Sequence, residues 1–259
     1  MKMRFHLFEL EDFAWYPNVI RENQTDYLRF LMELFDVFKA VIPVFEQAVQ
    51  QTKPDQIVDL CSGGGGSMMI FRKYLKTLHQ KPFKAILTDL YPNLKTFEFL
   101  RKESHNEIDF VAESVNASNP PQNLKGFYTL FNSFHHFKPA QAKEILQNAV
   151  KNNAPIAIFE PMEKSVLQIL INCLALTLLM WLATPFIRPF RWSRYFFTYL
   201  IPLIPFCTWF DGMVSVLRLY TPKEMLAIAN SLESSSYVWK AGVAKHTFGR
   251  VTYLIGYPK

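Results

Sequence analysis

A run of glycines lies between a short apolar segment and an amphipathic one. Residues 56–60 (QIVDL) carry an acid, Asp59, next to their end, and the glycines at 63–66 follow almost directly. Glycine lets the backbone approach a ligand closely, and N–H groups at the start of a helix can bind its polar groups. A second acid, Asp89, closes the next apolar segment, 84–90. A carboxylate at that place suits two ribose hydroxyls. The pattern predicts a nucleotide site; a flexible glycine loop with two unrelated acids is the alternative.

The residues around the glycines narrow the choice of nucleotide. A Walker loop needs Lys before Ser or Thr, and Gly66-Ser67 has none, which argues against nucleoside triphosphate hydrolysis. Asp59 just before the turn would repel a pyrophosphate and attract an ammonium group. This favours S-adenosylmethionine (SAM) over NAD. An NAD(P)-dependent oxidoreductase is a weaker alternative, since the chain has no recognisable Tyr-x-x-x-Lys pair.

Candidate catalytic groups follow two later apolar segments. His135 and His136 come after residues 126–134, and Glu160 ends residues 154–160. Methyl transfer requires alignment of acceptor, methyl group and sulfonium, and a base can remove a proton from the acceptor. His136 is the first candidate for that base, and a structural role for both histidines is the alternative. Glu160 either contacts the acceptor or forms a buried hydrogen bond. Tyr16 either covers the cofactor or packs in the N-terminal helical region.

Several motifs, in order along the chain, resemble those of class I SAM-dependent methyltransferases. They are VDLCSGGG (58–65), LTDL (87–90), ESVNA (113–117), LFNSFHHF (130–137) and LYTPKEM (219–225). Cys61 stands where the family has its first glycine, and Asn116 where it usually has Asp. The resemblance covers residues 53–160 and 219–259. It implies a seven-stranded sheet, SAM as the cofactor and transfer of a methyl group.

The same resemblance assigns residues to the cofactor. The expected contacts are Asp59, Cys61, Ser62, Gly63, Gly64, Gly65, Asp89, Leu90, Asn116, Ala117, Asn132 and Tyr16. Three scattered cysteines offer no metal-ligand spacing, and we expect no metal site.

The pattern of elements around these motifs predicts an α/β fold. Strand-like segments at 56–60, 84–90, 108–115, 126–134 and 154–160 alternate with helical ones at 67–80, 93–104 and 140–150. Such alternation is typical of a doubly wound, mostly parallel sheet, whose ligands lie at the carboxyl ends of the strands. A helix over 222–232, capped by Thr221, precedes two closing strands, the last of them antiparallel. The predicted division is a helical cap (1–52), a SAM-binding core (53–160), an apolar insertion (161–219) and the end of the core (220–259).

The N-terminal region has helical periodicity. Apolar residues recur at helical spacing through residues 25–49, and Pro43 should kink or split this helix.

The insertion is the most apolar part of the chain. Residues 165–187 carry no charge, Arg188, Arg191 and Arg194 follow, and residues 195–210 are again uncharged. The chain must return to the same sheet, so a single membrane crossing is excluded. We expect monotopic attachment, with arginines at the lipid headgroups. A soluble lid or a homodimer interface is the main alternative, and a spanning pair the third.

Composition leaves the acceptor partly open. The chain of 259 residues has a net charge of +6, which permits an anionic partner, but the small Arg cluster lies in membrane-like sequence and we expect no nucleic acid. The N-terminal residues lack an apolar signal segment, and sparse cysteines fit a reducing compartment, so a cytoplasmic, membrane-peripheral location is expected. The predicted acceptor is a hydrophobic small molecule or lipid. A non-catalytic binding module with this fold, attached to a membrane, is the alternative.

Overall fold

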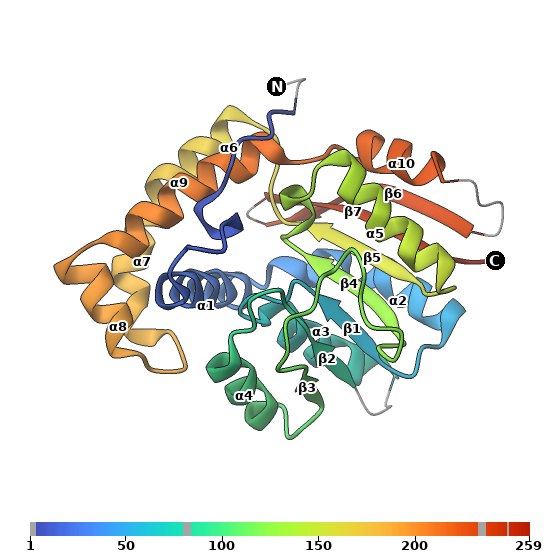
Figure 1. The fold of residues 1–259 in the computed structure, drawn as a ribbon, viewed down its shortest axis with the longest axis horizontal. Helices are drawn as coiled ribbons and strands as arrows, with labels where there is room; N and C mark the ends of the chain where they lie inside the picture. Colours follow the sequence, from blue (N-terminus) through green and yellow to red (C-terminus); the bar gives the residue numbers. More distant parts are fainter. Residues whose placement is uncertain (1–3, 80–83, 233–236, 248) are drawn as a thin grey trace.

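A computed structural model describes residues 4–79, 84–232, 237–247 and 249–259. A seven-stranded sheet in the order β3-β2-β1-β4-β5-β7-β6 forms its centre (Figure 1). The strands are β1 (Ile57–Leu60), β2 (Ala85–Leu87), β3 (Ile108–Phe110), β4 (Phe127–Phe131), β5 (Ile156–Glu160), β6 (Tyr237–His246) and β7 (Gly249–Pro258). The first five strands are parallel, and β7 is antiparallel to both of its neighbours. The predicted doubly wound fold is confirmed.

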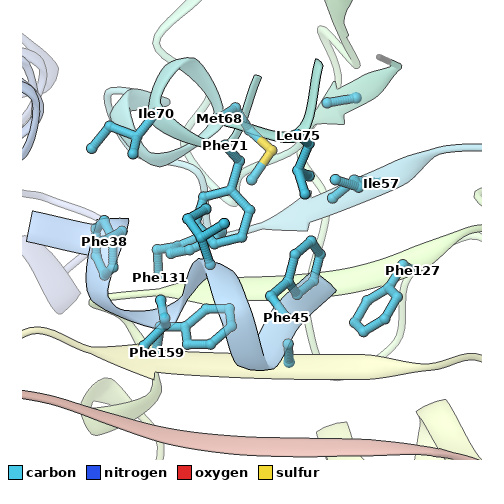
Figure 2. Close-up of a cluster of buried hydrophobic side chains, with 14 of the residues drawn as sticks. Phe38, Phe45, Ile57, Met68, Ile70, Phe71, Leu75, Phe127, Phe131 and Phe159 are labelled. Atoms are coloured by element: carbon cyan, nitrogen blue, oxygen red, sulfur yellow. The ribbon is translucent and has the colours of Figure 1, made fainter. Parts of the chain in front are cut away.

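Helices cover both faces of this sheet. One face packs against α2 (Ile42–Thr52), α3 (Gly66–His79) and α4 (Leu94–Glu103), and the other against α5 (Pro139–Lys151) and α10 (Pro222–Asn230). Figure 2 shows the phenylalanines of the first layer gathered between helices and strands. Phe71 of α3 lies 4.8 Å from Phe45 of α2 and 4.9 Å from Phe131 of β4, measured between ring centroids. Both strand faces are therefore buried, which explains their continuous apolar sequences.

The N-terminal region differs from its prediction. Helix α1 (Asn18–Leu34) begins seven residues before the predicted start at residue 25. A short 3-10 turn, η1 (Leu10–Asp12), precedes it. The helix ends before Asp36, whose φ of 48° is left-handed, and η2 (Val37–Val41) leads into α2. Pro43 does not break a helix but lies in the first turn of α2. Its missing N–H costs nothing there, because no intrahelical partner exists for it.

The insertion forms a long helical pair beside α1. Its first arm is continuous from α6 (Val166–Leu170) through η4 (Ile171–Leu176) and α7 (Thr177–Ala183) to η5 (Thr184–Phe186). After α8 (Trp192–Tyr195) and η6 (Phe196–Leu200) the chain bends by 80° into α9 (Leu203–Arg218). Figure 1 shows the first arm extending to one side of the sheet and α9 running back along α7 and α6 toward it, and these helices are in contact.

The outer surface of this pair is apolar. Among the described residues, the helix over 166–186 is long and apolar enough to cross a membrane, and only 19% of its most apolar window is buried. Residues 192–200 and 203–218 pass the same test only when the two helices, bent by 80°, are taken together. The large exposed side chains in this region are Val166, Leu167, Leu170, Ile171, Leu174, Leu178, Leu182, Phe186, Phe190, Trp192, Phe196, Tyr199, Leu200, Ile201, Leu203 and Phe206.

The arginines of the insertion do not lie together at that surface, contrary to the prediction. Arg194 is 1% exposed and donates to the buried carboxylate of Asp26 in α1. Arg191 donates to the same carboxylate at 3.0 Å and to Glu22 at 2.7 Å. Arg188 remains exposed. Two of these arginines therefore hold the insertion against α1, since a buried carboxylate must be paired.

Candidate functional site

The glycine loop joins β1 to α3 at the carboxyl edge of the sheet. Gly63 and Gly65 have φ of 52° and 71°, the left-handed region in which glycine has no steric cost. Cys61 also lies there, with φ of 58°. Cys61 therefore adopts a conformation that usually favours glycine. Ser62 secures the turn, since its N–H donates to the carbonyl of Thr88 at 2.9 Å.

Helix α1 packs directly on this loop, which the sequence did not reveal. A Cβ atom on Gly64 would lie 2.4 Å from the carbonyl oxygen of Thr25, and one on Gly66 would lie 2.4 Å from Cγ of Arg29. Real Cβ atoms do not come so close to other atoms. These two glycines are therefore required by the contact with α1.

The two strand-end acids have different positions. Asp89 lies at the cleft, where its carboxylate accepts the N–H of Gly63 and the N–H of Tyr91, both at 2.8 Å. Burial raises the pKa of Asp89. Asp59 lies beneath the loop, 2% exposed, and accepts the hydroxyl of Thr129 at 2.8 Å. Burial raises the pKa of Asp59 to about 7, although hydrogen bonds from Thr129 and Ser62 lower it.

A cleft of about 420 Å³ opens between the loop, α1 and the strand ends. Most of the predicted cofactor residues line it: Cys61, Ser62, Gly63, Gly64, Gly65, Asp89, Leu90, Asn116, Ala117 and Asn132. Asp59 is not among the lining residues, because it supports the loop from behind.

Tyr16 is also absent from the cleft, and its predicted place over the cofactor is wrong. Its side chain is 5% exposed and belongs to an apolar cluster with Ile20, Ile187 and Cys207. The hydroxyl donates to Gln24. The alternative interpretation, an aromatic residue packing in the helical region, is the observed one.

Several residues that line the cleft were not predicted from the sequence. Four of them come from α1: Arg21, Glu22, Thr25 and Arg29. Their spacing is that of any amphipathic helix and does not indicate a binding site. The guanidinium of Arg21 lies 3.9 Å from the ring centre of Tyr91. No local motif marks these residues, since α1 meets the loop only in the folded chain.

A second cavity of about 340 Å³ adjoins the first. Glu11, Leu28, Met32 and Asn132 line both. Its walls are mainly apolar, with Tyr27, Leu31, Phe35, Val37, Pro161, Met162, Ile171 and Leu176. Polar groups also line this second cavity, among them Gln24, His135 and Asp211. Mainly apolar walls with a few convergent polar groups are typical of small-molecule sites.

The two histidines line different cavities, His135 the apolar one and His136 the cleft. His135 is 1% exposed, and its Nδ1 lies 2.9 Å from Oε2 of Glu160, which is itself fully buried. His136 lines the cleft, and its Nδ1 lies 2.8 Å from Oδ1 of Asp12. Burial alone would lower the pKa of His136, but the Glu9 carboxylate, the hydrogen bond to Asp12 and Glu11 raise it to about 10.

Comparison with solved structures identifies the fold. The chain aligns over 94% of its length with a candidate O-methyltransferase from Nostoc punctiforme, at 12% identity and a TM-score of 0.51. It aligns over 91% of its length with human N-acetylserotonin methyltransferase in complex with SAM, at 12% identity and a TM-score of 0.52. The chain spans only 61% and 55% of those two proteins. No protein-family model and no curated protein matches the sequence. The chain has the class I methyltransferase fold.

Proposed function

We propose that this protein transfers a methyl group from SAM to a hydrophobic small-molecule or lipid-like acceptor at a membrane surface. The observation that carries the proposal is the pair of adjoining cavities at the carboxyl edge of the sheet. One is lined by the glycine loop and Asp89, and the other is apolar. The two solved structures of similar fold support methyl transfer at the level of the fold.

The cleft offers what SAM requires at each end. Asp89 retains lone pairs that can accept ribose hydroxyls besides its two backbone donors. The amino-acid end of SAM carries an ammonium group and a carboxylate. Buried polar atoms without a hydrogen-bond partner among the described residues include Oδ1 of Asn132 and Nε of Arg21 and of Arg29, three residues that line the cleft. An acceptor and two cationic donors of this kind suit those two groups.

The second cavity indicates the class of acceptor. Its walls come from α1, η2 and the insertion, and its volume falls in the range of small-molecule sites. An apolar acceptor would bury its surface there, with its reacting atom at the junction with the cleft.

The exposed face of the insertion supports a membrane as the place of reaction. Large apolar side chains follow one another along residues 166–206, with Trp192 79% exposed and Leu182 72% exposed. Contiguous apolar surface of this extent marks an interaction site, and Trp is enriched at membrane interfaces. Ile171 and Leu176 of the same arm line the apolar cavity, so the lipid-facing helix is also a wall of the acceptor site.

Cofactor binding is the first test. S-adenosylhomocysteine and NADH are each titrated calorimetrically into detergent-purified protein. We expect the former to bind, and D89A to weaken that binding by at least about tenfold through loss of the ribose acceptor. D109A is the matched control, because Asp109 is the middle residue of the neighbouring strand β3 and its side chain is 64% exposed. Binding of neither compound would favour a non-catalytic module, and binding of NADH alone would overturn the cofactor.

The acceptor is tested with SAM that carries a labelled methyl group. The protein is incubated in parallel with a membrane lipid extract, an aqueous metabolite extract and RNA. We expect label in the organic phase of the first reaction only. Label confined to a polar metabolite or to RNA would contradict the proposed acceptor.

A further inference from the structure

Glu9 lies beside the adjacent residues His135 and His136, which line the apolar cavity and the cleft respectively. One ligand atom each from Glu9, His135 and His136 lies within 4.8 Å of the others. Nε2 of His135 is 3.7 Å from Oε1 of Glu9, and Nε2 of His136 is 3.7 Å from Oε2. Two imidazoles and a carboxylate at such spacing are the ligand set of many catalytic zinc sites, which keep a fourth position open.

The opposite nitrogen of each histidine is already held by a carboxylate. Nδ1 of His135 faces Glu160 at 2.9 Å, and Nδ1 of His136 faces Asp12 at 2.8 Å. Since a carboxylate accepts, each Nδ1 carries the proton in these contacts. Nε2 is therefore the ring nitrogen that each histidine can offer to a metal ion, and in both it lies toward Glu9. Metal-binding histidines are oriented by carboxylates in the same way.

The Glu9 carboxylate faces Nε2 of both histidines. It is 0% exposed, and apart from an ion pair with Arg218 its oxygens have no hydrogen-bond partner among the described residues. A metal ion bound between the three groups would satisfy this buried carboxylate and would displace the proton that a charged His136 carries on Nε2.

Two arginines already lie nearby. Arg218 has Nη1 3.1 Å from Oε1 of Glu9 and 2.6 Å from Asp12, and its other donors reach the carbonyls of His135 and His136. Arg4 donates to the carbonyl of His135 at 3.0 Å. Glu11 and Glu160 add further carboxylates beside the histidines, so a bound cation would meet more acidic than basic side chains.

We infer that Glu9, His135 and His136 bind a divalent zinc-type ion, which holds an oxygen atom of the methyl acceptor. Glu11, whose Oε1 is 3.4 Å from Nε2 of His136, lines both cavities and takes the acceptor's proton. The chemical role rests on the proposed methyl transfer. The acceptor oxygen forms a bond to the methyl carbon as the carbon–sulfur bond breaks. Sulfur keeps that electron pair and loses its positive charge, and S-adenosylhomocysteine leaves. Coordination lowers the pKa of the oxygen, which makes it a better nucleophile at neutral pH.

Zinc binding is measured with Zn²⁺ alone, on untagged full-length protein stripped with a chelator. We expect one ion per chain. E9Q and H136N each remove a ligand and should weaken zinc binding by at least about 100-fold. E160Q changes the carboxylate that orients His135 and should weaken zinc binding by about 10- to 100-fold. H105N is the matched control, since His105 is an exposed residue at the end of α4 with φ of 57°, a conformation that Asn tolerates. Cobalt substitution should give the absorption bands of a four-coordinate site, altered in H136N.

S-adenosylhomocysteine binding is measured on the same samples. Retained binding in E9Q and H136N shows that these variants fold, so their loss of zinc is a loss of ligands. Absence of zinc binding, or zinc binding unchanged in both variants, overturns the metal site. Zinc binding without S-adenosylhomocysteine binding would contradict methyl transfer and leave the metal site standing.

Discussion

The hydroxyl of Thr129 in β4 donates a 2.8 Å hydrogen bond to the carboxyl of Asp59 in β1, beneath the loop that forms the cofactor cleft. Burial raises the pKa of this carboxyl from 3.8 to about 7. A buried acid with a raised pKa is more easily accommodated in its protonated form, which has no charge to desolvate. The loop therefore rests on a group whose charge changes near neutral pH.

Stability should fall with rising pH because of Asp59. Between pH 3.8 and about 7 the folded chain holds this proton and the unfolded chain has lost it. The contribution to the free energy of unfolding therefore decreases through this window, by about 1.4 kcal/mol for each unit of pH, and is constant above it. D59N keeps an acceptor for Thr129 and removes the titration. Urea unfolding at several pH values should show D59N gaining relative to wild type as pH rises. D109N, at an exposed carboxylate, should show no such gain. A D59N variant whose stability relative to wild type stays constant or falls as pH rises contradicts the assignment.

The contact between α1 and the glycine loop predicts that a side chain at Gly64 lowers both stability and cofactor binding. G64A places a Cβ atom 2.4 Å from the carbonyl oxygen of Thr25. Overpacking of this kind costs about 1–3 kcal/mol, and the displaced loop should also bind S-adenosylhomocysteine more weakly. Thermal unfolding and calorimetry measure the two effects. In G249A the new Cβ meets no atom within 4 Å, so both values should stay at the wild-type level. Equal behaviour of the two variants would show that α1 does not press on the loop.

Arg194 should be among the most important residues of the insertion for stability. Its side chain is 2% exposed and pairs with Asp26, which is fully buried. R194M would leave that carboxylate with Arg191 as its remaining cation, and we expect a loss of about 3 kcal/mol in the free energy of unfolding. K102M breaks an exposed pair with Glu98 at 3.5 Å and should cost less than about 1 kcal/mol. A small effect of R194M in denaturant unfolding would place the arginine at the surface after all.

The membrane proposal predicts a specific loss of lipid binding. Leu178 and Leu182 are 60% and 72% exposed on the first arm of the insertion. In the double variant L178E/L182E, flotation with phosphatidylglycerol–phosphatidylethanolamine vesicles should weaken by about 100-fold or more, because each buried leucine contributes about 1.5–3 kcal/mol. S-adenosylhomocysteine binding should persist. V243E, at a 45% exposed position on β6, is the control. If the double variant still floats but its mass by light scattering falls by half, the surface joins two copies of the chain.

The sequence predicted the parts of the site that are local along the chain. The glycine loop and Asp89 were recognisable because a strand, a turn and a helix follow one another within one βαβ unit. Glu9, Arg218 and the pairing of Asp26 with Arg194 were not recognisable, since their partners lie more than a hundred residues away. The arginines of the insertion were misread for the same reason. Positive charge beside apolar sequence resembles a membrane border, and only the fold shows that Asp26 neutralises it.

Asp211 and Arg218 lie on the inner side of α9, while the outer side of the same insertion is apolar. Asp211 accepts the N–H of Leu10 at 2.6 Å, and Arg218 binds Asp12 at 2.6 Å. Excising the insertion to obtain a better-behaved protein for crystallisation would therefore also remove the groups that fix the N-terminal segment over the two cavities. Replacing leucines on its outer face with charged residues improves solubility in water and keeps those groups in place.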